Sequence, residues 1–141
     1  MHLMKILTKD TDYAVRSLIL LTEDNESFLS AKKISETLNI PYHFLRGILQ
    51  KLIQYGLIES KEGVSGGVRI VKNPSKIRIM DLIQIFQGTF ELSDCMFRQK
   101  ICPDRKTCVL RDEIKRIENM VCKEFEELTI GTLLLKLKKK M

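Results

Sequence analysis

Residues 30–71 read SAKKISETLNIPYHFLRGILQKLIQYGLIESKEGVSGGVRIV, and this segment carries the signals of two short helices followed by a β-hairpin. Ser30 is a suitable N-cap for a helix that ends at Asn39. Pro41 stands where proline is tolerated, at the start of a second helix that runs to about Tyr55. Two short helices joined so tightly are a candidate helix-turn-helix.

A β-hairpin is expected directly after the second helix. Residues 57–60 and 68–71 are predicted to be two strands, joined by a glycine-rich turn at residues 63–67. Gly66 and Gly67 allow the backbone to bend sharply and to approach a phosphate closely. A helix-turn-helix followed at once by a hairpin is the pattern of a winged helix. The predicted fold class is therefore mainly α with a small β-wing.

Amphipathic helices are expected on both sides of this segment. Apolar residues recur at helical spacing within residues 8–23 and 80–87. From about Thr107 a longer helix has apolar positions spaced in a near-heptad pattern, which predicts pairing with a second copy of the chain. Packing of this helix against its own domain is the alternative. The apolar positions are Leu110, Ile114, Ile117, Val121, Phe125 and Leu128.

Length and composition point to one soluble domain with an appended helix. The 141 residues are 44% hydrophobic and 30% charged, which is ordinary for a globular protein. The formal net charge of +6 favours a polyanionic partner. No apolar run approaches the roughly 20 residues of a membrane span, and residues 1–7 are too short for a signal peptide. We therefore expect a cytoplasmic protein that makes no membrane contact.

Cys95, Cys102 and Cys108 are the candidate metal ligands. Gaps of six and five residues are too wide for a CxxC redox pair, but they suit a loop that brings three sulphurs to one large inorganic centre. Thiolates are the soft ligands that iron–sulphur clusters require. Three thiolates and one aspartate could instead hold zinc. Free thiols or a regulatory disulfide are the third interpretation.

Cys122 is expected to serve packing. It lies fourteen residues beyond Cys108, about 21 Å away along a continuous helix at roughly 1.5 Å per residue. Its neighbour Val121 is on the apolar side of that helix, where cysteine behaves as a small hydrophobe. The predicted organisation is a winged helix-turn-helix at residues 1–90, a cysteine loop at 91–108, and a dimerisation helix with its tail at 109–141.

The second helix of the helix-turn-helix would enter the major groove of DNA with its N-terminal residues nearest the bases. The candidate base contacts are Tyr42, His43 and Arg46, and the last could bind guanine in bidentate fashion. The candidate phosphate contacts are Lys51, Arg69, the backbone amides around Gly66 and Gly67, and the side chains of Lys32 and Lys33. A dimer would present two such helices and require a palindromic site.

The motifs together resemble the IscR/NsrR/RirA/CymR family of bacterial winged-helix repressors. The similar segments are TKDTDYAVR at 8–16, IPYHFLRGILQKL at 40–52, GLI at 56–58, GVSGG at 63–67 and DLI at 81–83, followed by three cysteines and TLL at 132–134. The resemblance covers nearly the whole chain. It implies a homodimeric regulator, not an enzyme, that binds a palindromic operator in double-stranded DNA. It also implies an iron–sulphur cluster, 4Fe-4S or 2Fe-2S, as in many members.

Within that family, Asp12 is similar to an aspartate of the nitric-oxide-sensing branch, which completes cluster coordination from the partner subunit. The resemblance therefore implies Cys95, Cys102, Cys108 and Asp12 as cluster ligands, with nitric oxide or oxygen as the signal. In the branch that controls cluster assembly the last ligand is a histidine, at the position that Arg111 occupies here. The alternative role of Asp12 is to stabilise the positive end of the first helix dipole.

Departures from the family pattern concern the operator more than the fold. Gly47 lies inside the expected recognition helix, where glycine costs about 1 kcal/mol relative to alanine. Glu62 stands where a basic residue often precedes the wing glycine, and Val68 stands where an aromatic residue often follows the glycine pair. The competing interpretation is a winged-helix regulator with a zinc site or a bare-thiol switch. A small redox enzyme is disfavoured because the sequence has no CxxC and no cofactor fingerprint.

Overall fold

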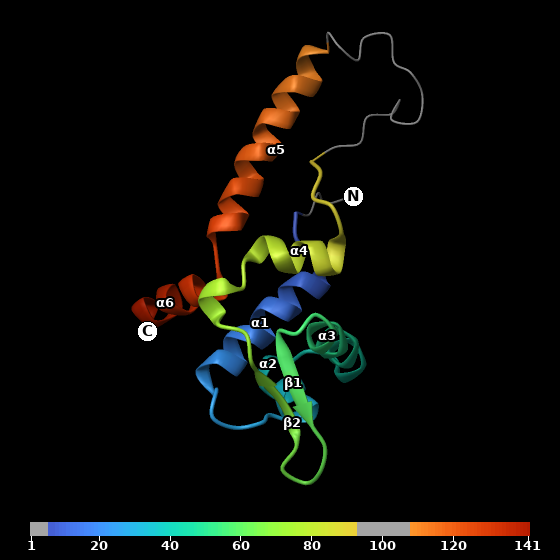
Figure 1. The fold of residues 1–141 in the computed structure, drawn as a ribbon, viewed down its shortest axis with the longest axis vertical. Helices are drawn as coiled ribbons and strands as arrows, with labels where there is room; N and C mark the ends of the chain where they lie inside the picture. The colour runs from blue at the N-terminus through green and yellow to red at the C-terminus, as the bar shows by residue number, and fades with distance from the viewer. Residues whose placement is uncertain (1–5, 93–107) are drawn as a thin grey trace.

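The computed structural model describes residues 6–92 and 108–141, and the elements expected from the sequence appear in the predicted order (Figure 1). A 3-10 helix at Pro74–Lys76 and a separate last helix at Ile130–Lys140 were not predicted. The helices are α1 (Lys9–Glu23), α2 (Ala31–Leu38), α3 (Tyr42–Gln54), α4 (Ile79–Gln87), α5 (Val109–Glu127) and α6 (Ile130–Lys140), with a 3-10 helix η1 at Pro74–Lys76. Strands β1 (Ile58–Lys61) and β2 (Gly67–Ile70) form an antiparallel hairpin between α3 and η1. The predicted fold class, mainly α with a small β-wing, is confirmed. None of the helices in the described ranges is long and apolar enough to cross a membrane.

Local hydrogen bonds set the turn between α2 and α3. The hydroxyl of Ser30 caps α2 by accepting the backbone N–H of Lys33 at 3.1 Å. At the other end, Asn39 takes the left-handed conformation with φ of 55°, which asparagine tolerates better than most residues. The Ser35 hydroxyl donates to the carbonyl of Ile40 at 2.6 Å, and the Ile40 side chain is buried. The chain can therefore leave α2 and enter α3 without a longer loop.

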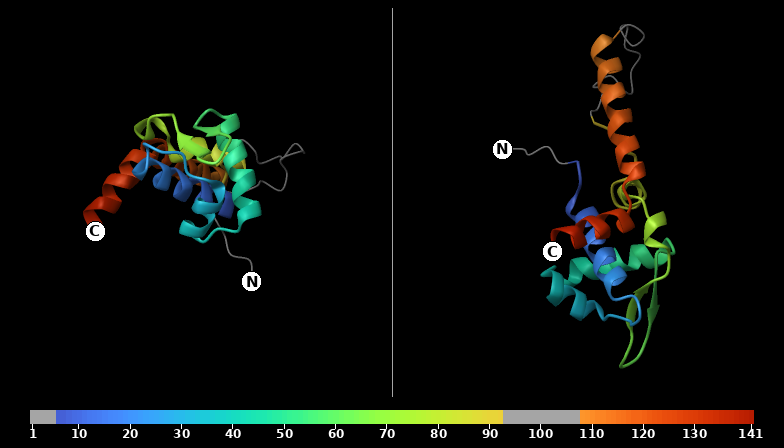
Figure 2. Two further views of the ribbon diagram at one scale, coloured as in Figure 1. Left: turned by 90° about the horizontal axis from the view of Figure 1, so that it is seen from below. Right: turned by 90° about the vertical axis from the view of Figure 1, so that its left-hand side faces the viewer.

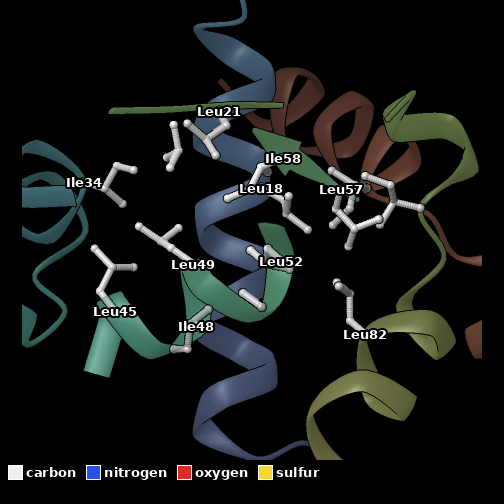
Figure 3. Close-up of a cluster of buried hydrophobic side chains, with 14 of the residues drawn as sticks. Leu18, Leu21, Ile34, Leu45, Ile48, Leu49, Leu52, Leu57, Ile58 and Leu82 are labelled. Atoms are coloured by element: carbon white, nitrogen blue, oxygen red, sulfur yellow. The ribbon is translucent and has the colours of Figure 1, made fainter. Parts of the chain in front are cut away.

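The hydrophobic core lies between α1, α3, β1 and α4 (Figure 3). Four leucines in this core are fully buried: Leu18 on α1, Leu45 and Leu52 on α3, and Leu82 on α4. Each fully buried leucine contributes roughly 2 kcal/mol to folding. Because the apolar side of α3 is used in this way, the opposite side of that helix remains exposed.

The β1–β2 hairpin is fastened to the segment that precedes α2. The backbone N–H of Leu29 donates to the carbonyl of Val68 at 2.9 Å, and the Val68 N–H donates back to Leu29 at 2.8 Å. A Cβ on Gly67 would lie 2.2 Å from the Leu29 carbonyl oxygen, and one on Gly66 would lie 2.1 Å from that of Lys61. Both glycines therefore permit a close approach within the chain's own backbone.

Helix α5 rises away from the winged-helix core, at the opposite end from the hairpin, and α6 returns to the core (Figures 1 and 2). The link between them is bonded to the segment before α4. The Ile79 N–H donates to the Leu128 carbonyl at 2.8 Å, and the Ile130 N–H donates to the Ile77 carbonyl at 2.9 Å. Ile130 is fully buried. The residues that follow α5 are thus built into the core.

The two ends of α5 have different surroundings. Near its C-terminal end, Cys122, Phe125 and Leu128 pack against the core, and the Phe125 ring meets Phe90 edge-on with centroids 5.9 Å apart. Further towards its N-terminal end the helix exposes large apolar side chains: Val109, Leu110, Ile117 and Met120. Packing against the core therefore accounts for only part of the apolar stripe.

We predict that Gly67→Ala destabilises the fold by at least about 2 kcal/mol. Gly67 has φ of 149°, and the added methyl would collide with the Leu29 carbonyl, so the strand must move. Urea denaturation measures the change. Gly63→Ala is the matched control, because Gly63 has φ of 110° but a Cβ there meets no atom within 4 Å. Equal losses for the two variants would contradict the proposed collision.

Candidate nucleic-acid interface and metal ligands

The candidate base-contacting residues lie on the exposed side of α3. Tyr42, His43 and Arg46 are exposed, whereas Leu45 and Leu49 of the same helix are buried. The Arg46 guanidinium lies over the Tyr42 ring, with Cζ 5.9 Å from the ring centroid. At an exposed site this cation–π contact contributes roughly 0.5 kcal/mol. This contact can orient the Arg46 side chain, but it is too weak to prevent the guanidinium from binding a ligand.

Phe44, which sequence reasoning missed, is also exposed on α3. Its side chain is 52% exposed, and its ring contacts that of His43 with centroids 4.2 Å apart. The signal was present in the helical period, because Phe44 falls outside the stripe that holds Leu45 and Leu49. An exposed phenylalanine on this helix offers an apolar surface where DNA would lie.

Arg69 on β2 is engaged within the wing. Its Nε donates to Glu59 Oε1 at 3.2 Å, and its Nη2 donates to the same oxygen. The Arg69 Cζ also lies 4.5 Å from the centroid of the Phe28 ring, and Lys61 Nζ lies 5.7 Å from that centroid. Glu59 thus offsets the positive charge of Arg69. The ring of Phe28 lies beside both Arg69 and Lys61. The register that pairs Glu59 with Arg69 could have been inferred from the hairpin turn.

The other candidate phosphate contacts have varied surroundings. The Gly66 N–H donates to a carbonyl within the same turn, that of Gly63, at 3.1 Å. Lys51 Nζ lies 5.5 Å from the centroid of the Phe86 ring on α4. The backbone of Gly67 pairs with that of Lys61 in the hairpin. The predicted contacts on α2 are the exposed Lys32 and Lys33.

Two of the candidate cluster ligands, Cys95 and Cys102, lie outside the described residues. Cys108 is the N-cap of α5; its side chain is half-buried and makes no capping hydrogen bond. Asp12 is near the start of α1, where its Oδ2 accepts a hydrogen bond from Arg16 Nε at 2.9 Å. Within residues 6–92 and 108–141, no three His, Cys, Asp or Glu side chains gather closely enough to hold a metal ion.

Cys122 has the surroundings of a packing residue. Partial burial raises the pKa of its thiol, the carboxylates of Glu118 and Glu126 raise it further, and Lys115 partly opposes them. The thiolate is the form that binds metals. A raised pKa therefore makes Cys122 a poorer ligand, in keeping with the role expected from its position beside Val121.

Gln87 ties the start of α1 to the end of α4. Its Oε1 accepts hydrogen bonds from the Thr8 N–H at 3.0 Å and from the Thr11 hydroxyl at 2.7 Å, and its Nε2 donates to the Ile6 carbonyl at 2.9 Å. Thr11 is fully buried. The turn of α1 that carries Asp12 is therefore held against the end of α4, from which the chain continues towards Cys95.

A helix-turn-helix with an outward-facing second helix and an attached hairpin defines a winged-helix DNA-binding protein. Residues 7–136 match the Rrf2 family, described as iron-dependent transcriptional regulators, and the chain belongs to this family. It is thus a DNA-binding transcriptional regulator and not an enzyme.

Individual relatives agree with this assignment. The chain is 27% identical over 129 residues to the HTH-type transcriptional repressor NsrR of Streptomyces coelicolor, covering 90% of this chain and 86% of that protein. Its fold is similar to that of CymR, the global cysteine regulator of B. subtilis, with a TM-score of 0.79, 23% identity, and coverage of 94% and 98%. The T. potens IscR structure has a TM-score of 0.77 at 18% identity, with coverage of 98% and 91%.

We predict that Glu59→Gln increases the affinity for non-specific duplex DNA. Removing the carboxylate charge leaves Arg69 on Phe28 but makes its positive charge available to a phosphate. The slope of log K against log salt concentration should steepen by about 0.9, the value for one added phosphate contact. Fluorescence anisotropy over a salt series measures it.

Glu62→Gln is the matched control, since Glu62 is exposed in the wing turn and the substitution makes the same change in net charge. An equal increase in affinity with both variants would mean that net charge, not release of Arg69, is responsible.

Proposed function

We propose that the chain acts as a homodimeric repressor whose affinity for a palindromic operator is controlled by an iron–sulphur cluster. The cluster would be held by Cys95, Cys102, Cys108 and, across the dimer, Asp12. The signal would be nitric oxide, redox state or the supply of iron. The observation that carries this proposal is the place of Cys108, a thiol at the first turn of the same helix that exposes the apolar face.

Dimerisation is supported by the exposed apolar side chains of α5. Val109, Leu110, Ile117 and Met120 are exposed on a helix that stands away from the core. Exposed apolar residues grouped in this way usually mark an interface. The near-heptad spacing is typical of two helices that pack along their length. We infer that a second copy of α5 covers this face.

The donor set fits the proposed cofactor. Three thiolates and one oxygen ligand are acceptable to an iron–sulphur cluster. When bound, such a cluster would supply an iron that nitric oxide or oxygen can attack, above all at a carboxylate ligand. Among residues 6–92 and 108–141, the Cys108 sulphur makes no capping hydrogen bond, and the ion pair of Asp12 is with the exposed Arg16. An exposed ion pair of this kind is worth about 0.5 kcal/mol or less, so Asp12 can exchange partners.

The chain's own residues can couple these ligands to DNA binding. Cys108 is the N-cap of α5, whose other end is bonded to the core through Leu128 and Ile130. Gln87 holds the Asp12 turn of α1 against α4. A ligand set that joins Cys108 of one subunit to Asp12 of the other would fix the angle between the two recognition helices. A preference of about 1.4 kcal/mol for one angle changes operator affinity tenfold.

Protein purified without oxygen should contain iron and sulphide and absorb visible light. Cys108→Ala should abolish the bound iron and sulphide and the visible absorption, because the substitution removes a cluster ligand. Cys122→Ala should leave the iron and sulphide content unchanged, because this thiol packs against the core. Colourless wild-type protein that contains zinc but no sulphide would support the zinc regulator instead, and metal-free protein would support the bare-thiol switch.

Asp12→Ala should alter the visible spectrum and the rate at which nitric oxide bleaches it. Arg16→Ala is the matched control, because it breaks the same ion pair but keeps the carboxylate. An unchanged spectrum and rate in Asp12→Ala would rule out Asp12 as a ligand. Equal changes in both variants would assign the effect to the ion pair.

Ile117→Lys should convert the dimer to a monomer at micromolar concentration, because a charge would be buried in the apolar interface. Since Ile117 is exposed in the single chain, the fold should be retained. Light scattering measures the mass, and circular dichroism checks the fold. Asn119→Lys introduces the same charge on the opposite side of α5 and should remain dimeric; a monomer there too would argue against this interface.

A further inference from the structure

Gly47 lies in the middle of α3, and the described chain offers no steric reason for a glycine there. A Cβ built on Gly47 would meet no atom within 4 Å, whereas at Gly67 it would collide with Leu29. Gly47 also lacks the positive φ that favours glycine. Glycine inside a helix lowers its stability relative to alanine. A destabilising glycine that relieves no contact within the chain points to something that approaches from outside.

The surface around Gly47 is formed by its neighbours one helical turn away, His43, Phe44, Gln50 and Lys51, which are all exposed. We call this surface the Gly47 notch. On one side the His43 and Phe44 rings touch, with centroids 4.2 Å apart, and Phe44 is 52% exposed. The floor of the notch is helix backbone whose polar groups are bonded within α3. The helix surface is therefore open at Gly47, with Phe44 as its large apolar neighbour and with polar side chains on the other neighbouring positions.

One group on the base edges of DNA suits an open helix surface beside an exposed phenylalanine. In the major groove the edges of the bases carry hydrogen-bond donors and acceptors, together with the C5-methyl of thymine, which prefers apolar partners such as phenylalanine. We propose that the Gly47 notch receives a thymine methyl, with Phe44 as its apolar wall. The inference rests on the proposed function, because it requires that α3 enters the major groove. It makes thymine a required base at one position of each half-site.

The test begins with duplexes selected from a random DNA library by the wild-type protein. Each thymine of the selected sequence is then replaced by deoxyuridine, which lacks only the methyl group. Replacement in one half-site only should weaken binding about fourfold, as expected for one buried methyl group. Phe44→Ala should bind the two duplexes equally. Fluorescence anisotropy measures each dissociation constant.

Gly47→Ala should change stability and affinity in opposite directions. The melting temperature should rise by about 3 °C because alanine favours the helix. The selected duplex should bind about tenfold more weakly because the new methyl fills the notch. Replacing thymine by deoxyuridine should then no longer change the dissociation constant. Asn119→Ala, on the exposed surface of α5, is the control that stabilises a helix without touching DNA.

Four outcomes are distinguishable. If wild-type protein selects no duplex, the proposed function fails and this inference falls with it. If a duplex is selected but Gly47→Ala binds it as tightly as wild type, the notch has no role, although DNA binding stands. If Gly47→Ala binds more weakly but wild type tolerates deoxyuridine at every position, the thymine methyl is the wrong ligand. The inference is supported if Gly47→Ala raises the melting temperature and lowers the affinity. In addition, wild type must bind more weakly when one thymine is replaced by deoxyuridine, and Gly47→Ala must bind both duplexes equally.

Discussion

The packing of α3 against α1 holds the recognition helix in place. Leu18 and Leu21 on α1 are fully buried, as are Leu45 and Leu52 on α3. Truncating one such leucine to alanine typically costs about 3 kcal/mol, a large share of the roughly 5–15 kcal/mol that keeps a domain folded. Because this contact sets the rotation of α3 about its own axis, it also decides which of its side chains face outward. Specific base contacts require that kind of rigid support.

The same core connects the two functional regions. Gln87 joins α1 to α4 through three hydrogen bonds, and Leu128 and Ile130 join the end of α5 to the segment before α4. Both elements that flank the cysteine segment, α4 and α5, are therefore attached to the body that carries α3. A displacement of Cys108 at the N-terminal end of α5 would be transmitted along one continuous helix. In the regulator proposed above, ligand capture would change the relation between subunits while each winged domain stays rigid.

In the wing, the formal net charge does not show which cations are free to bind DNA. Arg69 and Lys61 are both counted in the net charge of +6, yet Glu59 binds the first and Phe28 lies beside both. Lys51 lies over Phe86 of α4 and Arg46 lies over Tyr42 with Cζ 5.9 Å from the ring centroid, and contacts with neutral rings leave the charge of both cations in place. Base and phosphate contacts therefore depend on which cations the tertiary contacts leave uncompensated.

Local signals were enough to predict α1 to α5 and the hairpin in their order, but not η1 or α6. The cap at Ser30, the turn at Asn39 and Pro41, and the 3.6-residue period of α3 act over a few neighbouring residues, so they can be recognised without coordinates. The three-cysteine ligand set stays a prediction from sequence, because Cys95 and Cys102 lie outside the described residues. Contacts between distant segments could not be predicted this way. Phe28 meets Arg69, Gln87 meets Thr11, and the backbone at Gly67 approaches Leu29 because folding brings remote parts of the chain together, and no local preference specifies such meetings.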